Sequence, residues 1–286
     1  MGRIIDYNEF WKLAVKRRPS FKKEEDDPGA SWDKRADYYD SSVRENLTHT
    51  LKDISFLDLK PDDTVLDVGA GTGRLAVPIS AKVKAVTAID PSARMLMYLR
   101  DNMIESKRRN CRCVQKRWED VCLKKDLDPH DVVISAFSMG FADARWALDK
   151  LHRASKRMVY IYWFAGKRRD DEFLKYIADK MGKNNVEKPH FPDYICIMNV
   201  LHDMGIYADL KIYQYEWHNT YRNIEDAVSK ALLNRRITAD EKSYAYEYFE
   251  KTLKKEENGL YSQKIKTSTA LISWNVEETS YTSDFV

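Results

Sequence analysis

The chain has 286 residues, of which 43% are hydrophobic and 12% aromatic, so it can bury a proper core and a disordered chain is excluded. Its length fits one enlarged α/β domain or two modest ones. Lys and Arg (48) nearly balance Asp and Glu (45), and the resulting net charge of +3 does not favour a global electrostatic grip on nucleic acid. No apolar stretch approaches the roughly 18 residues of a membrane-spanning helix, and the charged N-terminus is unlike a secretory signal. We therefore expect a cytoplasmic enzyme with no membrane partner.

The first 55 residues predict helices. An opening helix around 10–14 leads into charge blocks with Pro and Gly at 16–29, which are typical of a flexible arm or lid. A further helix is expected around Trp32 and Tyr38, which fall at helical spacing, and a helical pattern continues over 43–57. We interpret this N-terminal part of the chain as a helical arm that covers the folded core.

After residue 60 the hydrophobic pattern alternates between strands and helices. Short runs rich in β-branched residues predict five strands, at 64–68, 83–89, 111–115, 131–137 and 158–164. Helical segments lie between them. This alternation predicts a parallel sheet with helices on both faces. We take residues 56–165 as the core of that sheet.

The pattern becomes less regular after Gly166. Helices are expected at 170–181 and up to Gly205, and 208–217 alternates like a strand. Two more helices and a last strand follow, at 223–236, 239–256 and 264–274. We therefore expect residues 166–286 to complete the sheet, with a helical insertion at about 218–262 before the last strand.

A glycine-rich segment follows the first predicted strand. Only ten glycines occur in the chain, and three of them fall at 69–73. A strand, a glycine-rich turn and a helix let the backbone approach a ligand closely and point helix N–H groups at it. Asp90 ends the next strand, where a carboxylate can accept both hydroxyls of a ribose. Dinucleotide enzymes carry their third glycine one residue later, at the position of Arg74 in this chain, which argues against NAD or FAD.

The segment Val65–Gly73 resembles the nucleotide-binding motif of class I S-adenosylmethionine-dependent methyltransferases. Later motifs of the family also have counterparts in the right order, for the ribose-binding strand end, the adenine contact, the fourth strand and the N-terminal helix that covers the cofactor: 88–92, 117–120, 131–137 and 32–40. The resemblance spans residues 31–165, about half the chain. It implies a Rossmann-like α/β fold with a seven-stranded, mostly parallel sheet whose last strand is antiparallel.

The resemblance also implies S-adenosyl-L-methionine as the cofactor and S-adenosyl-L-homocysteine as its product. Asp90 is expected at the ribose, Trp118 and Glu119 at the adenine edge and Met95 on the adenine face. Aromatic rings are expected near the sulfonium, which they attract by about 2 kcal/mol at most when water is excluded. The cofactor-binding residues expected on this basis are Trp32, Tyr38, Asp67, Gly69, Ala70, Gly71, Gly73, Asp90, Pro91, Met95, Trp118, Glu119, Ala136 and Phe137.

No residue of the sequence stands out as a catalytic base. The candidates for such a base lie near the expected strand ends or in flanking segments. They are Tyr38, Ser138, Tyr162, Trp163 and His190. The six histidines and four cysteines lack metal-ligand spacing, so no metal site is predicted. Cys111 and Cys113 are interpreted as buried structural thiols.

A small-molecule methyltransferase is the function that the sequence favours. Family members that methylate amide or exocyclic nitrogens commonly carry an Asn/Asp-Pro-Pro-Tyr/Phe motif after strand four, where this chain has Ser135–Gly140. An RNA methyltransferase would need the basic clusters, at 107–109, 167–169 and 235–236, to lie on one face. A dinucleotide oxidoreductase and a non-catalytic S-adenosylmethionine-binding protein remain as alternatives. The N-terminal arm and the helical insertion are expected to determine the substrate.

Overall fold

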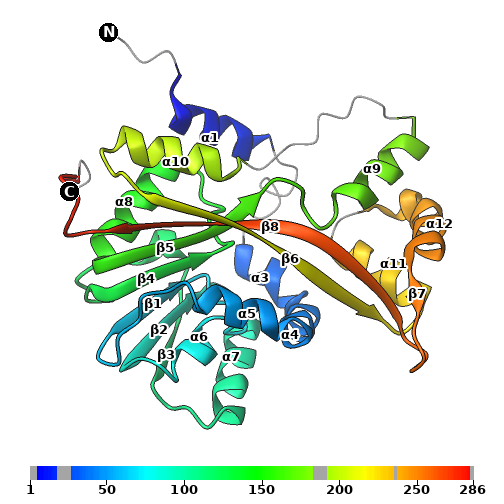
Figure 1. Ribbon diagram of the computed structural model, residues 1–286, viewed down its shortest axis with the longest axis horizontal. Coiled ribbons are helices and arrows are strands. Elements are labelled where there is room, and N and C mark those ends of the chain that lie inside the picture. The colour runs from blue at the N-terminus through cyan, green and yellow to red at the C-terminus, as the bar shows by residue number, and fades with distance from the viewer. Residues whose placement is uncertain (1–4, 18–26, 183–191, 235–236, 284–286) are drawn as a thin grey trace.

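The computed structural model describes residues 5–17, 27–182, 192–234 and 237–283 (Figure 1). Most of the predicted charged arm, His190 and the basic pair at 235–236 lie outside these described residues. Within them, no helix is both long and apolar enough to cross a bilayer.

A single mixed sheet forms the centre of the molecule (Figure 1). Its strand order is β3-β2-β1-β4-β5-β8-β6, and a two-residue strand, β7, pairs with β8 outside this path. All long strands run parallel except β8, which is antiparallel to both β5 and β6. The predicted Rossmann-like sheet with an antiparallel last strand is confirmed; only the short β7 was not expected. The strand bounds are β1 Thr64–Val68, β2 Ala85–Asp90, β3 Cys111–Gln115, β4 His130–Ala136, β5 Ser155–Ala165, β6 Asp209–Tyr221, β7 Lys254–Lys255 and β8 Tyr261–Asn275.

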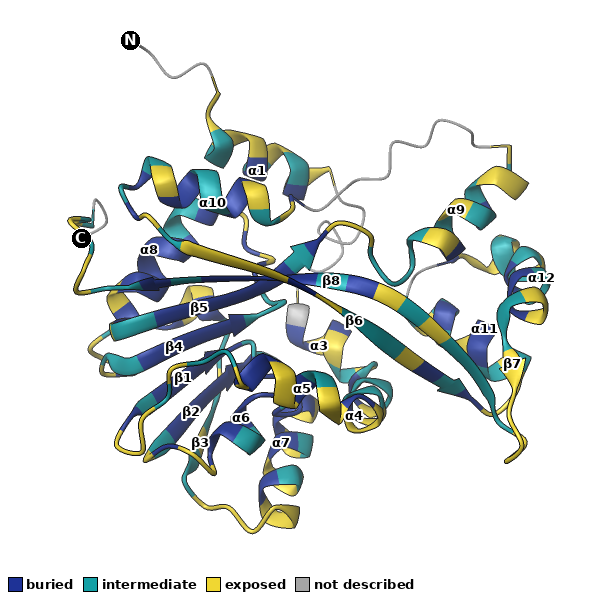
Figure 2. Cartoon of the chain, viewed as in Figure 1, coloured by how far each residue is buried: buried dark blue, intermediate teal, exposed yellow. Residues whose placement is uncertain are grey.

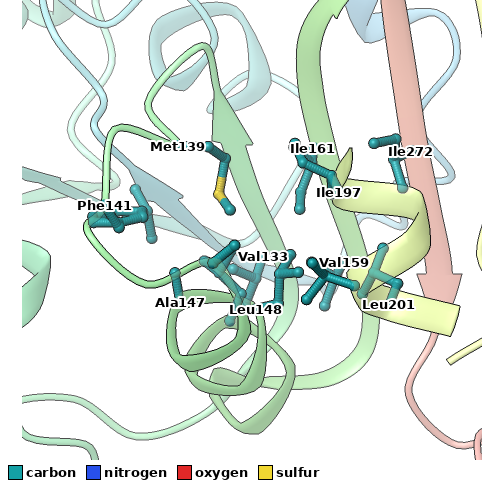
Figure 3. Close-up of a cluster of buried hydrophobic side chains, with 14 of the residues drawn as sticks. Val133, Met139, Phe141, Ala147, Leu148, Val159, Ile161, Ile197, Leu201 and Ile272 are labelled. Atoms are coloured by element: carbon teal, nitrogen blue, oxygen red, sulfur yellow. The ribbon is translucent and has the colours of Figure 1, made fainter. Parts of the chain in front are cut away.

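Helices cover both faces of the sheet, as predicted (Figures 1 and 2). One face carries α1 (Tyr7–Lys16), α8 (Ala144–Ala154) and α10 (Tyr194–Asp203), whose side chains pack on strand residues such as Val133 and Ile161. Figure 3 shows part of this cluster, in which Leu148 and Leu201 face Val159 across the helix–sheet interface. The other face carries α5 (Leu47–Ile54), α6 (Ala76–Ile79) and α7 (Ala93–Glu105).

The strand order reverses between β1 and β4. From β1 the chain proceeds outward to β2 and β3, whereas β4 and β5 lie on the opposite side of β1. Val68 pairs with both Ile89 and Ser135, so the carboxyl ends of these three strands meet at one edge. A crevice at such a reversal is where open α/β sheets bind ligands. The fold therefore directs attention to the segments that follow β1, β2 and β4.

The last two long strands extend beyond the rest of the sheet. Pairing continues to Tyr221↔Tyr261, whereas β5 pairs with β8 only as far as Ala165↔Ser268. The predicted strands, 208–217 and 264–274, were therefore too short, because β6 and β8 continue to pair with each other after the pairing of β8 with β5 has ended. The projecting ribbon carries α11 (Ile224–Leu233), the 3₁₀ helix η2 (Ala239–Glu241) and α12 (Lys242–Thr252). With α9 (Asp171–Lys180) these helices form a separate small core.

The helix predicted over 43–57 is two helices. α4 (Ala36–Glu45) ends before Asn46, and α5 begins after it. The Asn46 side chain donates to the His218 carbonyl at 3.0 Å and accepts from the His218 N–H at 3.1 Å. This amide therefore pairs with the edge of β6, which explains why the helix breaks there. The thiols of Cys111 and Cys113 are another correction: both lie half-buried on edge strand β3, because only one side of that strand has a neighbour.

Candidate functional site

The glycine-rich turn joins β1 to α6 in a conformation that needs glycine. Gly69, Gly71 and Gly73 all have positive φ angles, of 76°, 57° and 88°. A Cβ on Gly69 would lie 2.4 Å from the Ser138 Cβ, so the loops after β1 and β4 touch at this point. A Cβ on Gly73 would lie 2.7 Å from Val77 and 2.9 Å from Leu99, so this third glycine lets α6 approach α7 closely.

Asp90 connects the glycine turn to the end of β2. Its Oδ2 accepts the Gly71 N–H at 2.9 Å, and its Oδ1 accepts the Ser92 N–H at 2.9 Å. The side chain is 7% exposed, and burial raises the pKa of Asp90 to about 6. Each carboxylate oxygen has a second lone pair, so the pair of oxygens can accept further hydrogen bonds from a ligand hydroxyl.

A short helix near the amino end of the described chain docks beside Asp90. α3 (Pro28–Asp33) brings the Asp33 carboxylate to the N-terminus of α7, where it accepts from Ser92 Oγ at 2.5 Å and the Arg94 N–H at 3.0 Å. A Cβ on Gly29 would lie 2.6 Å from the Pro91 carbonyl, so only glycine permits this approach. The next helix, α4, is linked to α7 by Asp37, which accepts from Arg94 and Tyr98. These contacts hold α3 and α4 over the carboxyl edge of the sheet.

The segment after β3 forms a 3₁₀ turn, η1 (Trp118–Asp120), that is fixed from below by a buried lysine. Lys150 of α8 donates to the Trp118 carbonyl at 2.5 Å, and its ammonium lies 4.8 Å from the ring centroids of Trp118 and Trp146. Burial lowers the pKa of Lys150. The indole Nε1 of Trp118 is buried and has no hydrogen-bond partner among the described residues.

The end of β4 is the remaining wall of the crevice. Phe137 has a φ of 56°, which is uncommon outside glycine and marks a strained position. Its N–H donates to the Tyr162 carbonyl at 2.9 Å, which prolongs the pairing with β5. Ser138 then donates to the Val68 carbonyl at 2.6 Å. The loop is thus tied to both neighbouring strands while the Phe137 ring faces the crevice.

These segments surround a pocket of about 980 Å³. One part, which we call the glycine half, lies over the ends of β1, β2 and β3; its lining includes Gly69, Gly71, Asp90, Pro91, Met95, Lys116, Arg117, Trp118 and Glu119. The other part, which we call the arginine half, lies toward β5, β8 and β6; its lining includes His49, Asp53, Arg74, Phe164, Arg168, Arg169, Asp170, Leu174, Tyr215, Trp217, Asn234, Thr267 and Ser268. Phe137 and Tyr39 lie where the two halves meet.

The structure brings most of the predicted cofactor residues together on this pocket. Those that line it are Trp32, Tyr38, Gly69, Gly71, Asp90, Pro91, Met95, Trp118, Glu119, Ala136 and Phe137. Asp67, Ala70 and Gly73 do not line it: all three are buried, and burial raises the pKa of Asp67, on β1 behind the glycine turn, to about 7. Of the candidate bases, Tyr38, Ser138 and Trp163 line the pocket, and Tyr162 is buried with its hydroxyl donating to the Asp53 carbonyl.

The arginine half contains residues that sequence reasoning missed. Arg74 had been considered only as a departure from a dinucleotide motif, but its Nη1 pairs with Asp53 at 2.5 Å. Asp53 also accepts from the Tyr213 hydroxyl at 2.6 Å. Arg169 stacks 4.0 Å above the Trp217 ring. For Arg169, the sequence offered one local indication of a site, the pair Arg168–Arg169 directly after a predicted strand. For Trp217 it offered none, because this residue reaches the pocket through the position of β6 beside β8.

The first helix supports the pocket from beneath. α1 packs against α8 and α10, and Trp11 donates to the Phe141 carbonyl at 2.8 Å. Lys12 and Asn8 contact the Asp143 carboxylate, at 3.0 and 3.1 Å. Because Phe141 and Asp143 line the pocket, α1 braces one of its walls.

A mostly parallel sheet whose reversal point carries a glycine turn and a carboxylate is typical of Rossmann-like architecture. Residues 65–158 match the sequence pattern of a methyltransferase domain family. This part of the chain is therefore similar to methyltransferase domains, and the Rossmann-like fold agrees with that similarity. The matched segment contains the glycine turn, Asp90, η1 and β4; most of the arginine half lies outside it.

Individual proteins are also similar to this chain in sequence or in fold. An uncharacterised protein of Haemophilus influenzae is 26% identical over 87% of this chain and 90% of its own length. A dimethyladenosine transferase of Yarrowia lipolytica is 41% identical over 81 residues, which are 27% of this chain and 24% of that protein. The crystal structure of a candidate methyltransferase from Bacillus halodurans superposes with a TM-score of 0.51 at 18% identity, over 81% of this chain and 99% of that one.

Proposed function

We propose that this protein is an S-adenosylmethionine-dependent methyltransferase that acts on a small-molecule acceptor by direct methyl displacement. The observation that carries the proposal is the position of Asp90: its half-satisfied carboxylate and the glycine turn share one end of a pocket large enough for a donor and an acceptor. The proposal rests on the family for the reaction and on the pocket for the class of acceptor.

The residues of the glycine half fit S-adenosylmethionine. Asp90 offers free lone pairs for the two ribose hydroxyls, and Gly69 and Gly71 have no side chains of their own to obstruct a ligand. We assign the adenine to Trp118 and the exposed Glu119, which line the glycine half together with Asp90. Met95 is 2% exposed and contributes an apolar contact on the same wall.

When bound, the donor supplies an electrophilic methyl group on a sulfonium. The contribution of the chain is alignment and exclusion of water, which in well-oriented reactions lowers barriers by about 7–11 kcal/mol. Phe137 and Tyr39 present aromatic rings where the two halves meet. Burial raises the pKa of Tyr39 and of Tyr162, so both phenols stay protonated at neutral pH. We therefore assign no proton transfer to these phenols, and the proposed acceptor is nucleophilic as bound.

The placement of the basic clusters supports a small molecule over RNA. Residues 107–109 precede β3 at the amino edge of the sheet, whereas 167–169 follow β5 at the carboxyl edge. Phosphate-backbone binding needs cations on one face. Arg168 and Arg169 are moreover stacked on rings inside the pocket. The dinucleotide oxidoreductase alternative loses support as well. Arg74 occupies the position of the third glycine in the dinucleotide motif, and its side chain pairs with Asp53.

The transfer step can be tested with a donor that carries an isotope-labelled methyl group. The purified protein is incubated with this donor and a cell extract separated into a small-molecule fraction and an RNA fraction. We expect label in the small-molecule fraction, reduced by Asp90→Ala. Label confined to RNA would support the RNA alternative, and binding of donor without label in either fraction would support a non-catalytic protein.

A further inference from the structure

The arginine half has room for a second molecule beside the donor. A pocket for one drug-sized ligand spans roughly 300–1,000 Å³, and this pocket, at about 980 Å³, reaches the top of that range. Its arginine half lies beyond the end of β5 and along the ribbon that β6 and β8 form past that point. A ligand there would therefore meet side chains that the glycine half does not offer.

Aromatic rings stand on two sides of the arginine half. Phe137 and Phe164, from the ends of β4 and β5, have ring centroids 5.1 Å apart. Tyr215 and Trp217, from β6, have centroids 6.3 Å apart. His49 of α5 adds a third ring to the side of Tyr215 and Trp217, with its centroid 4.3 Å from that of Tyr215. Such walls bind flat ring systems through stacked and edge contacts.

The same half carries an excess of positive charge. Three arginines and two aspartates line it, and one of the aspartates, Asp53, is held by Arg74 and Tyr213. Arg168 lies 4.6 Å above the Phe164 ring, and Arg169 lies 4.0 Å above the Trp217 ring. When a guanidinium stacks on a ring, its N–H groups point outward in the guanidinium plane. Two parallel N–H groups there match the two oxygens of a carboxylate.

Arg74 provides an independent observation. Its side chain is 10% exposed, and its Nη2 is buried without a hydrogen-bond partner among the described residues. A buried donor in this condition is unfavourable until a ligand accepts a hydrogen bond from it. Arg74 and Arg169 both lie near the Tyr39 phenol, where their positive charges oppose the rise in its pKa that burial causes. The cations of the arginine half therefore converge beside the boundary with the glycine half.

We propose that the arginine half binds a methyl acceptor that combines a flat aromatic ring system with a carboxylate, the rings against Phe164 and Trp217 and the carboxylate at Arg169 and Arg74. This inference rests on the proposed function, because it assigns the glycine half to the donor. Arg169 and Trp217 are then specificity-determining residues of the same reaction.

The test uses the intact protein saturated with S-adenosylhomocysteine, whose binding is measured first. Pyrene-1-carboxylate and its neutral analogue pyrene-1-methanol are then titrated, and pyrene fluorescence is followed. We expect the carboxylate to bind at least tenfold more tightly than the alcohol. Equal affinities, or no binding of either pyrene to the saturated protein, would overturn the inference but leave the donor site intact. Failure to bind S-adenosylhomocysteine would instead overturn the proposed function.

Two variants separate the charge from the fold. Arg169→Met is expected to reduce the preference for the carboxylate to below threefold, whereas Lys167→Met, which removes an exposed positive charge two residues away, should leave it unchanged. Trp217→Leu should weaken both pyrenes equally. A preference that survives Arg169→Met would contradict the assignment of the carboxylate to this residue.

Two ligands offer a carboxylate to Arg74: the acceptor and the methionine part of the donor. The paired variant Arg74→Met with Asp53→Asn removes both charges of the buried pair, so no unpaired ion is left behind. Binding of S-adenosylhomocysteine is compared with that of 5′-methylthioadenosine, which lacks the amino acid. We expect the ratio of the two affinities to stay as in the unmodified protein. A ratio that falls at least tenfold would assign Arg74 to the donor and remove it from the acceptor site.

Discussion

Asp90 accepts two backbone N–H groups and lies at the ribose end of the proposed donor site. Burial raises its pKa to about 6, because the surrounding protein disfavours the charged form. Above that pH the carboxylate accepts hydrogen bonds on both oxygens. Below it, one oxygen carries a proton that competes with the hydroxyls of the ligand.

The first prediction is therefore a loss of donor affinity on the acid side. Binding of S-adenosylhomocysteine should be constant above about pH 7 and roughly tenfold weaker at pH 5, one unit below the pKa. Calorimetric titration between pH 5 and 8 measures this. Asp90→Asn serves as the control, because its amide does not titrate and its affinity should stay low and flat. An affinity of the unmodified protein that is equal at pH 5 and 8 would contradict the role of Asp90.

Asp67 makes a different contribution, to stability rather than to binding. It lies behind the glycine turn, and burial raises its pKa to about 7 from an ordinary value of 3.8. The folded chain therefore holds this proton more tightly than the unfolded chain, and the free energy of unfolding falls as the pH rises from about 4 to 7. Asp67→Asn should remove this loss and stabilise the protein at pH 8 by on the order of 1–2 kcal/mol.

Denaturant unfolding of the two proteins at pH 5 and pH 8 measures the effect of Asp67→Asn. The unmodified protein should lose more stability between these values than the variant does. A variant that is less stable than the unmodified protein at pH 8 would show that the Asp67 charge is favourable in the fold. Because Asp67 lies behind the turn, the variant should still bind S-adenosylhomocysteine.

Individual residues differ in how far the sequence predicts them. Gly71 and Asp90 were predicted because their roles depend on a local sequence of strand, turn and helix. Lys150, Arg169 and Trp217 were not, because each reaches the pocket through contacts between segments that are distant in the chain. The burial of Lys150 between two indoles, for instance, requires α8 and η1 to pack together, and no spacing in the sequence indicates that.

At the scale of elements, η1 depends on α8 for its position. The Lys150 ammonium holds the Trp118 carbonyl and stands between the rings of Trp118 and Trp146. We infer that it positions the turn that meets adenine in the proposed donor site. Lys150→Met keeps the length of the side chain but leaves the carbonyl without this donor.

Lys150→Met is therefore expected to lower the affinity for S-adenosylhomocysteine roughly three- to tenfold, corresponding to one lost hydrogen bond of about 1 kcal/mol. The informative readout is the ratio of this affinity to that for S-inosylhomocysteine, in which hypoxanthine replaces adenine. The ratio should fall in Lys150→Met and stay constant in Arg153→Met, a variant of the same helix whose charge pairs with Asp149. Equal weakening of both ligands would indicate a general structural role.

The helix α1 offers a second prediction at this scale. Trp11 is fully buried, and its indole N–H donates to the Phe141 carbonyl in a pocket wall. Trp11→Phe keeps an aromatic ring but leaves that carbonyl unpaired, which should cost about 1–3 kcal/mol of unfolding free energy. Trp11→Ala adds a cavity and should cost about 3–5 kcal/mol. Urea unfolding distinguishes them, and a Trp11→Phe variant as stable as the unmodified protein would contradict the bracing role.

Elements were predicted better in the first half of the sheet than in the second. The strands from β1 to β5 came from short β-branched runs between helices, and their existence and direction are confirmed. β6 was predicted to end too early and β8 to begin too late, because the two strands pair with each other beyond the rest of the sheet. The break at Asn46 was missed for a similar reason, since its cause is the backbone of β6.

The whole molecule combines a central sheet covered by helices with two attachments at its carboxyl edge. The sheet and its two helical layers place the glycine turn, Asp90 and Phe137 at one edge, while α3 and α4 close that edge from one side. The β6–β8 ribbon with α9, α11 and α12 closes it from the other. The family match covers β1 to β4 and the start of β5, whereas Phe164, Arg169 and Trp217, which are proposed to bind the acceptor, lie beyond it.

The central claim is that the glycine half binds the methyl donor. Calorimetric titration of the purified protein with S-adenosylhomocysteine tests it most directly, with Asp90→Ala and, as a control on the helix that follows, Asp101→Ala. We predict saturable binding at one site per chain, weaker by roughly ten- to hundredfold in Asp90→Ala and unchanged in Asp101→Ala. A folded protein that does not bind, or one whose binding is indifferent to Asp90→Ala, would contradict the account.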